Sequence, residues 1–99
     1  MDHPSITRRP QQDNARGTFD LDRDGKRVGY LSYSLPDAAV MTIDYVEVSP
    51  SLRGTGLGQQ LVGAAVEWAR ANGRQIVPYC GYARTVMHRT AAFRDVLRT

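Results

Sequence analysis

The chain has 99 residues, of which 41% are hydrophobic and 23% charged, and its formal net charge is +3. This length suits one small globular domain, and no run approaches the roughly 18 apolar residues that a membrane span requires. The polar N-terminal segment lacks the apolar stretch of a signal peptide, so a cytoplasmic protein without membrane contact is expected. Cys80 is the one cysteine, which excludes an internal disulfide, and with only His3 and His88 beside it no metal site is expected.

The positive charge comes almost entirely from arginine, since Lys26 is the one lysine among 13 basic residues. The arginines are scattered along the chain, and their longest run is Arg8-Arg9. This distribution favours phosphate-bearing ligands but is too diffuse to indicate a nucleic-acid surface by itself. A nucleic-acid partner is therefore not expected.

Residues 1–15 combine prolines, glutamines and charges with little apolar content, and this composition predicts a flexible tail. Solubility alone accounts for the Arg8-Arg9 pair within it. Residues 16–99 are expected to form a single domain, because no repeat or linker interrupts them.

Three strands are predicted in the first half of the domain. Apolar and polar residues alternate from Thr18 onwards, as in a half-buried strand. Asp24-Gly25 separates this strand from a second one at 28–35, and an Asp-Gly pair between two such runs predicts a hairpin. Pro36-Asp37 is expected to end the second strand. The third strand covers 40–48, so the three should form an antiparallel meander.

Helices and a further strand are predicted in the second half. Apolar side chains recur at three- and four-residue steps from Leu57, and Asn72-Gly73 is expected to close this helix. Residues 75–79 fit a short fourth strand, which can run parallel to the third through the helical crossover. Residues 82–88 and a last turn through Leu97 are expected to be helical. The predicted fold class is α+β, a mixed α/β arrangement in the order β-β-β-α-β-α.

The loop between the third strand and the helix reads Arg53-Gly54-Thr55-Gly56-Leu57-Gly58. Glycine allows close backbone approach to a ligand, and the first N–H groups of a helix attract phosphate. No lysine follows the last glycine, which excludes a Walker-type phosphate loop, and Gln59 stands where a dinucleotide-binding pattern requires glycine. The loop therefore predicts a pyrophosphate site to which Arg53 adds charge.

The stretch 46–58 resembles the cofactor signature of the GNAT superfamily of acyl-CoA-dependent N-acetyltransferases. In that signature a strand ending V-x-V is followed by [RQ]-x-x-G-x-[GA] and a helix, and Arg53, Gly56 and Gly58 occupy its fixed places. The resemblance extends over residues 14–97 to a minimal single-domain branch of predicted small acetyltransferases. The segments that carry it are Phe19-Asp20-Leu21, Asp24-Gly25, Ile43-Asp44-Tyr45-Val46-Glu47-Val48 and Val77-Pro78-Tyr79-Cys80.

The resemblance implies that the third and fourth strands separate and that acetyl-CoA (coenzyme A) lies in the gap. The pantetheine arm is then expected on the backbone of 46–48, and the pyrophosphate on the amides of 54–59. The branch lacks the first helices of larger relatives, which implies an open acceptor site. The implied cofactor-binding residues are Val46, Val48, Arg53, Gly54, Thr55, Gly56, Leu57, Gly58, Gln59 and Cys80.

Two residues are the candidates for catalysis. The resemblance places Cys80 beside the thioester, where it could act as a nucleophile or donate a proton to coenzyme A; the alternative is a buried structural thiol. Glu47 is preferred over Asp44 as general base because it matches the motif position, although both could be plain surface carboxylates. Tyr79 and Tyr82 flank Cys80 and could donate a hydroxyl or fill core volume.

The leading hypothesis is an acetyl-CoA-dependent N-acetyltransferase acting on an amine acceptor, either a small molecule or a protein. A non-catalytic acyl-CoA-binding or regulatory module shares the loop but needs no acid, base or thiol. A basic nucleic-acid-binding domain is the third alternative. An exposed sheet edge leaves room for a monomer or a weak homodimer.

Overall fold

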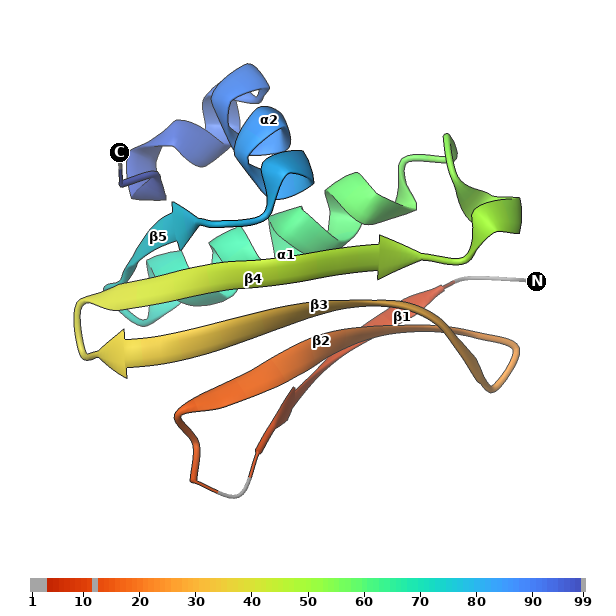
Figure 1. The fold of residues 1–99 in the computed structure, drawn as a ribbon, viewed down its shortest axis with the longest axis horizontal. Helices are drawn as coiled ribbons and strands as arrows, with labels where there is room; N and C mark the ends of the chain where they lie inside the picture. Colours follow the sequence, from red (N-terminus) through yellow and green to blue (C-terminus); the bar gives the residue numbers. More distant parts are fainter. Residues whose placement is uncertain (1–3, 12, 99) are drawn as a thin grey trace.

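A five-stranded sheet in the order β1-β2-β3-β4-β5 forms the framework of the molecule, and two helices pack against it (Figure 1). The computed structural model describes residues 4–11 and 13–98. The predicted α+β class is confirmed, with one strand more than expected. The elements are β1 (Ser5–Pro10), β2 (Arg16–Arg23), β3 (Lys26–Asp37), β4 (Val40–Val48), the 3-10 turn η1 (Pro50–Leu52), α1 (Leu57–Ala71), β5 (Gln75–Pro78), α2 (Gly81–Arg89) and the 3-10 helix η2 (Ala91–Val96).

The additional strand is β1, which pairs antiparallel with β2 from Ser5 opposite Asp22 to Pro10 opposite Gly17. The prediction of a flexible tail is therefore wrong for Ser5–Pro10. The predicted tail began at residue 1, and residues 1–3 and 12 of it lie outside the described residues.

Arginine takes the place of an apolar residue on the inner side of β1. The Arg8 guanidinium lies 4.9 Å from the centre of the Trp68 ring and donates a hydrogen bond to the Tyr33 hydroxyl at 3.0 Å. A long arginine side chain can cover aromatic surface while its charge stays near water. A pattern search that treats arginine as fully solvated therefore misses this strand.

The predicted hairpin and meander are confirmed. Asp24 and Gly25 join β2 to β3 with φ angles of 53° and 77°, the left-handed conformations that a tight hairpin turn requires. β3 then pairs antiparallel with β4. The strand β3 continues through Pro36 and ends at Asp37, two residues beyond the predicted end at residue 35, after a register shift between Ser34 and Asp37.

The helix α1 covers the sheet and supplies more of the core than any other element. Its buried side chains are those of Leu57, Leu61, Val62, Ala65, Val66 and Ala69, and they pack with the inner residues of β2, β3 and β4. The shorter α2 adds Ala83, Val86 and Met87 to the same cluster. No helix within residues 4–11 and 13–98 is long and apolar enough to cross a membrane.

The strands β4 and β5 run parallel and then separate, as the resemblance implies. They are paired from Val40 opposite Gln75 to Ile43 opposite Pro78. The amides of Tyr79 and Cys80 both donate to the Ile43 carbonyl, at 3.0 and 3.2 Å, so the parallel pairing ends there. The rest of β4, residues 44–48, pairs only with β3 in the described part of the chain. Its free edge therefore faces an opening.

Candidate active site

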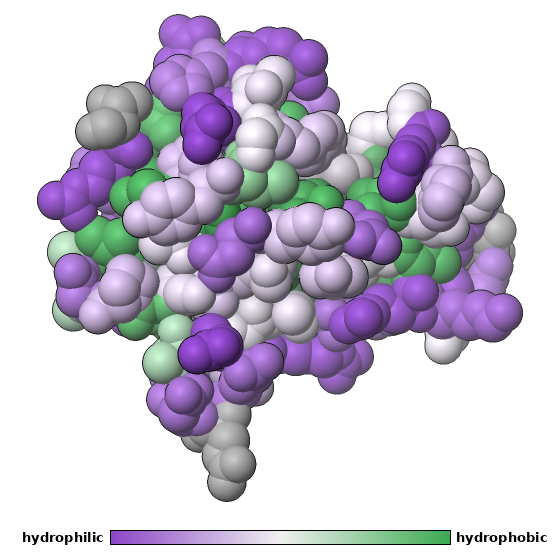
Figure 2. Space-filling view, viewed as in Figure 1, coloured by the Kyte–Doolittle hydropathy of each residue, from purple (hydrophilic) through white to green (hydrophobic). Residues whose placement is uncertain are grey.

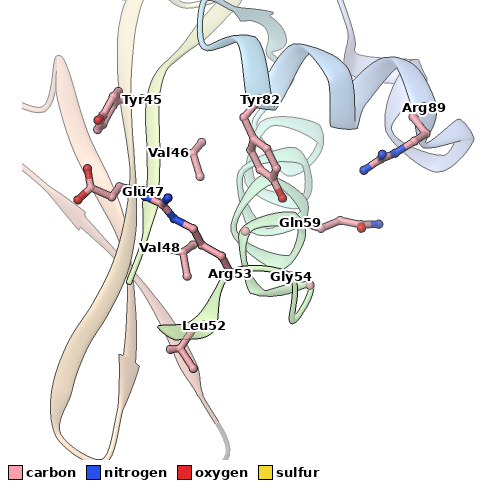
Figure 3. A pocket seen from close by; sticks show the side chains of 12 residues that line it. Tyr45, Val46, Glu47, Val48, Leu52, Arg53, Gly54, Gln59, Tyr82 and Arg89 are labelled. Carbon is pink, nitrogen blue, oxygen red and sulfur yellow. The ribbon is translucent and has the colours of Figure 1, made fainter. Parts of the chain in front are cut away.

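An open cavity of about 610 Å³ occupies the gap between the free part of β4, the glycine-rich loop and α2. Figure 2 shows the hollow between α2 and the loop, with apolar residues at its base and hydrophilic residues around it. The cavity, called the groove below, is lined by Tyr45, Val46, Glu47, Val48, Leu52, Arg53, Gly54, Gly56, Gly58, Gln59, Tyr82 and Arg89 (Figure 3).

The loop that precedes α1 depends on two glycines in the left-handed conformation. Gly54 and Gly56 have φ angles of 83° and 86°, and Gly56 is the N-cap residue of α1. A Cβ atom at either position meets no atom within 4 Å, so conformation and not crowding explains why glycine is present. The loop shape follows directly from these two residues.

Several backbone amides at the start of α1 remain without an acceptor. The first hydrogen bond into the helix runs from the Gln60 amide to the Gly56 carbonyl at 3.1 Å. The Thr55 amide donates to the Leu52 carbonyl at 3.3 Å, but the other residues from Gly54 to Gln59 each have an N–H group for which the described part of the chain provides no partner. They are Gly54, Gly56, Leu57, Gly58 and Gln59. Together with the positive end of the helix dipole, these amides favour an anion.

The third glycine of the loop serves close packing. A Cβ atom on Gly58 comes within 2.7 Å of the Tyr82 hydroxyl and 3.1 Å of its ring. Tyr82 on α2 thereby closes the groove against α1, and no larger residue fits at position 58 unless this tyrosine moves.

The β4 wall of the groove is apolar on one side and polar on the other. In Figure 3 the side chains of Val46 and Val48 point towards α1, whereas Tyr45 and Glu47 point away from it. Both valines are half-buried and pack against the core. The backbone of 44–48 lies between these two sets of side chains, free to accept an added strand-like ligand.

Glu47 lies beside Tyr45 on the same strand. The ability of the Glu47 carboxylate to accept a hydrogen bond from the Tyr45 hydroxyl raises the pKa of Tyr45 above its usual value near 10. The negative charge of Glu47 acts in the same direction. Asp44 is held differently, because Ser34 and Thr42 donate hydrogen bonds to its two oxygens at 2.6 and 2.8 Å. Of the two carboxylates, Glu47 lines the groove and Asp44 does not.

We expect E47Q to lower the pKa of Tyr45, because the substitution removes the negative charge that disfavours the phenolate. Titration of tyrosine ring carbons by NMR measures the shift, with Y45F to assign the signal. D44N is the matched control and should leave the Tyr45 titration unchanged. Since the folded-state pKa is raised, the stability that the pair provides is full below about pH 10 and is lost as the pH rises through that pKa. An unchanged Tyr45 titration in E47Q contradicts this pairing.

Three of the predicted site residues do not line the groove. Thr55 donates its hydroxyl to the Leu52 carbonyl and so stabilises the loop. Leu57 is buried in the core. Cys80 is half-buried and packs against the core at the point where β4 and β5 separate. It remains close enough to Tyr45 to make a minor contribution to the raised pKa of that hydroxyl.

Four residues that line the groove are not among the predicted site residues. Tyr45 precedes the 46–58 stretch, Leu52 lies within it, and Tyr82 and Arg89 come from α2. Tyr82 and Arg89 are seven positions apart, which places them on one side of a helix two turns from each other. That spacing is the sequence signal by which Arg89 could have been found once Tyr82 was considered.

The sequence model of the family described as GCN5-related N-acetyl-transferase matches residues 18–96. This chain belongs to that family. A comparison with curated protein sequences gives no match.

Solved structures show the same fold. A GCN5-like N-acetyltransferase candidate from Staphylococcus aureus has a TM-score of 0.73 at 26% identity, over 95% of this chain and 87% of that one. A ribosomal-protein-alanine N-acetyltransferase from Brucella melitensis has a TM-score of 0.65 at 19% identity, over 81% and 64% of the two chains. A GNAT acetyltransferase from Elizabethkingia anophelis, solved with acetyl-CoA bound, has a TM-score of 0.64 at 12% identity, over 90% and 72%.

Proposed function

We propose that this chain is an acetyl-CoA-dependent N-acetyltransferase that transfers an acetyl group to an amine of a small molecule or a protein. The observation that carries the proposal is the row of unpartnered amides at the start of α1, next to the free edge of β4. The start of α1 offers sites for an anion, and the free edge of β4 offers backbone hydrogen bonds. A pantetheine joined to a pyrophosphate needs both kinds of site.

The residues present fit this cofactor along its length. The unpartnered amides of Gly54 and of residues 56–59, together with the Arg53 guanidinium, are suited to the pyrophosphate. Val46, Val48 and Tyr82 give the groove an apolar lining, while the β4 backbone can bond the amides of the pantetheine. When bound, acetyl-CoA supplies an acetyl group activated as a thioester.

The chain's own side chains handle the protons. An amine acceptor arrives mostly as an ammonium ion, and the exposed Glu47 carboxylate, which lies beside the Tyr45 hydroxyl, can take its proton. The departing thiolate needs a proton in turn, and the Cys80 thiol at the separation of the strands is the proposed donor. Cys80 as the nucleophile, acetylated before the amine attacks, stays as the alternative role for that residue.

One observation favours a second function. Cys80 packs against the core and does not line the groove, as expected for an acyl-CoA-binding module that performs no chemistry. The N-acetyltransferase and the non-catalytic module are both expected to bind acetyl-CoA, but only the N-acetyltransferase turns it over.

Calorimetric titration with acetyl-CoA tests the cofactor, and release of coenzyme A with a panel of amines tests the reaction. We expect binding, turnover and a loss of about 100-fold in kcat for E47Q with little change in affinity. C80A should bind acetyl-CoA like the unmodified chain and turn over more slowly. Intact mass spectrometry of the unmodified chain after incubation with acetyl-CoA shows whether an acetyl adduct on Cys80 exists. No binding at millimolar acetyl-CoA contradicts both functions. Binding without turnover for any amine identifies the non-catalytic module.

A further inference from the structure

Two arginines of the groove have no partner within the described residues. Arg53 lies on the loop and Arg89 at the end of α2, and neither guanidinium forms an ion pair or a hydrogen bond there. Several arginines outside the groove are engaged: Arg9 and Arg27 bind Asp20, and Arg70 binds Asp95. The two groove arginines therefore keep their donors available to a ligand.

Arg89 and Arg53 stand on different sides of the anion-binding amides. In Figure 3 Arg53 extends beside β4, whereas Arg89 and Gln59 lie on the other side of the start of α1. All three residues line one groove. A ligand that follows the free edge of β4 and crosses the amides of 54–59 then continues towards Arg89.

Coenzyme A has an anionic group at the corresponding place. Beyond the pyrophosphate, on the side away from the pantetheine, its ribose carries a separate phosphate at the 3′ position. On the basis of the proposed function, we infer that Arg89 binds this 3′-phosphate and selects coenzyme A over its 3′-dephospho form. The fork of guanidinium donors suits a terminal phosphate, which exposes three oxygens.

A purely structural role for Arg89 makes a different prediction. A cation in the last turn of a helix interacts favourably with the carbonyl end of the helix dipole. That interaction affects the stability of α2 and is the same whichever form of the cofactor is present. Selectivity between two ligands that differ by one phosphate therefore separates the two roles.

The experiment measures the affinities of coenzyme A and 3′-dephospho-coenzyme A by calorimetry, at low ionic strength, for three proteins. These are the unmodified chain, R89Q and the control R84Q. Arg84 is exposed on the same helix, does not line the groove, and its replacement removes the same charge. Thermal unfolding of the three proteins accompanies the titrations as a measure of folding.

We expect the unmodified chain to bind coenzyme A about five- to tenfold more tightly than the dephospho form, the range for an exposed charge-assisted contact. R89Q should remove this preference by weakening coenzyme A binding alone, and R84Q should retain it. Equal affinity for the two ligands in the unmodified chain, or equal weakening of both in R89Q, overturns the role of Arg89 while the proposed function stands. If the unmodified chain binds neither ligand, the proposed function fails as well.

Discussion

Replacing Gly56 with valine is expected to weaken acetyl-CoA binding by at least about 100-fold, the equivalent of losing two or more charge-assisted hydrogen bonds. Gly56 has a φ angle of 86°, and a β-branched residue avoids that conformation strongly. The valine is expected to rotate the loop out of the left-handed region, and the amides that follow then no longer point into the groove. Calorimetric titration with acetyl-CoA measures the loss.

A matched control separates this effect from general destabilisation. Gly25 has a φ angle of 77° in the β2–β3 turn, and a Cβ atom there, as at Gly56, meets nothing within 4 Å. G25V and G56V should therefore lose similar stability in urea, about 1–2 kcal/mol each. Only G56V should lose the cofactor. Equal affinities in the two variants mean that the loop geometry does not create the anion site.

The loop could be predicted from the sequence because its signal is local. Three glycines at alternate positions and one arginine, directly before a helical pattern, define both the backbone conformation and the charge. The structure shows that the three glycines are needed for different reasons. Gly54 and Gly56 supply positive φ angles, whereas Gly58 supplies space for Tyr82.

The far wall of the groove could not be predicted in the same way. Tyr82 and Arg89 enter it because α2 packs against α1, a contact between segments that are distant in sequence. For Cys80 the position in the chain could be predicted, but the packing of the side chain could not. Cys80 lies at the separation of β4 and β5, as the resemblance implies, but only the packing shows that it contacts the core and does not line the groove.

The strands also differ in whether local sequence signals or distant contacts determine them. The hairpin β2–β3 and the strand β4 carry an Asp-Gly turn and dense β-branched or aromatic residues, so composition and spacing suffice. β1 carries neither signal. Its inner surface is formed by Ile6 and by Arg8 over Trp68, a contact that exists only once α1 is in place.

Gly17 connects this unpredicted strand to the core, and G17A is expected to destabilise the fold by about 1–3 kcal/mol, the usual range for overpacking. A Cβ atom at position 17 comes within 2.6 Å of the Tyr33 hydroxyl, 2.7 Å of the Arg9 carbonyl and 2.9 Å of the Pro10 Cα. Two of these atoms belong to the backbone of β1, which cannot yield by a side-chain rotation. The strand must therefore shift away from β2. Urea unfolding measures the free energy, and amide hydrogen exchange measures the loss of protection in β1.

G81A is the control, since a Cβ atom on Gly81 meets nothing within 4 Å and its φ angle is not positive. Alanine in this first turn of α2 should leave stability equal or raise it by up to about 1 kcal/mol. Y33F in the G17A background removes one of the three close atoms and should restore only part of the lost stability, because the β1 backbone remains in the way. Gly17 does not line the groove, so folded G17A should bind acetyl-CoA within about twofold of the unmodified chain. A G17A protein as stable as G81A, with β1 amides still protected, contradicts the close packing of β1 on β2 and returns this segment to the flexible tail that its composition suggests.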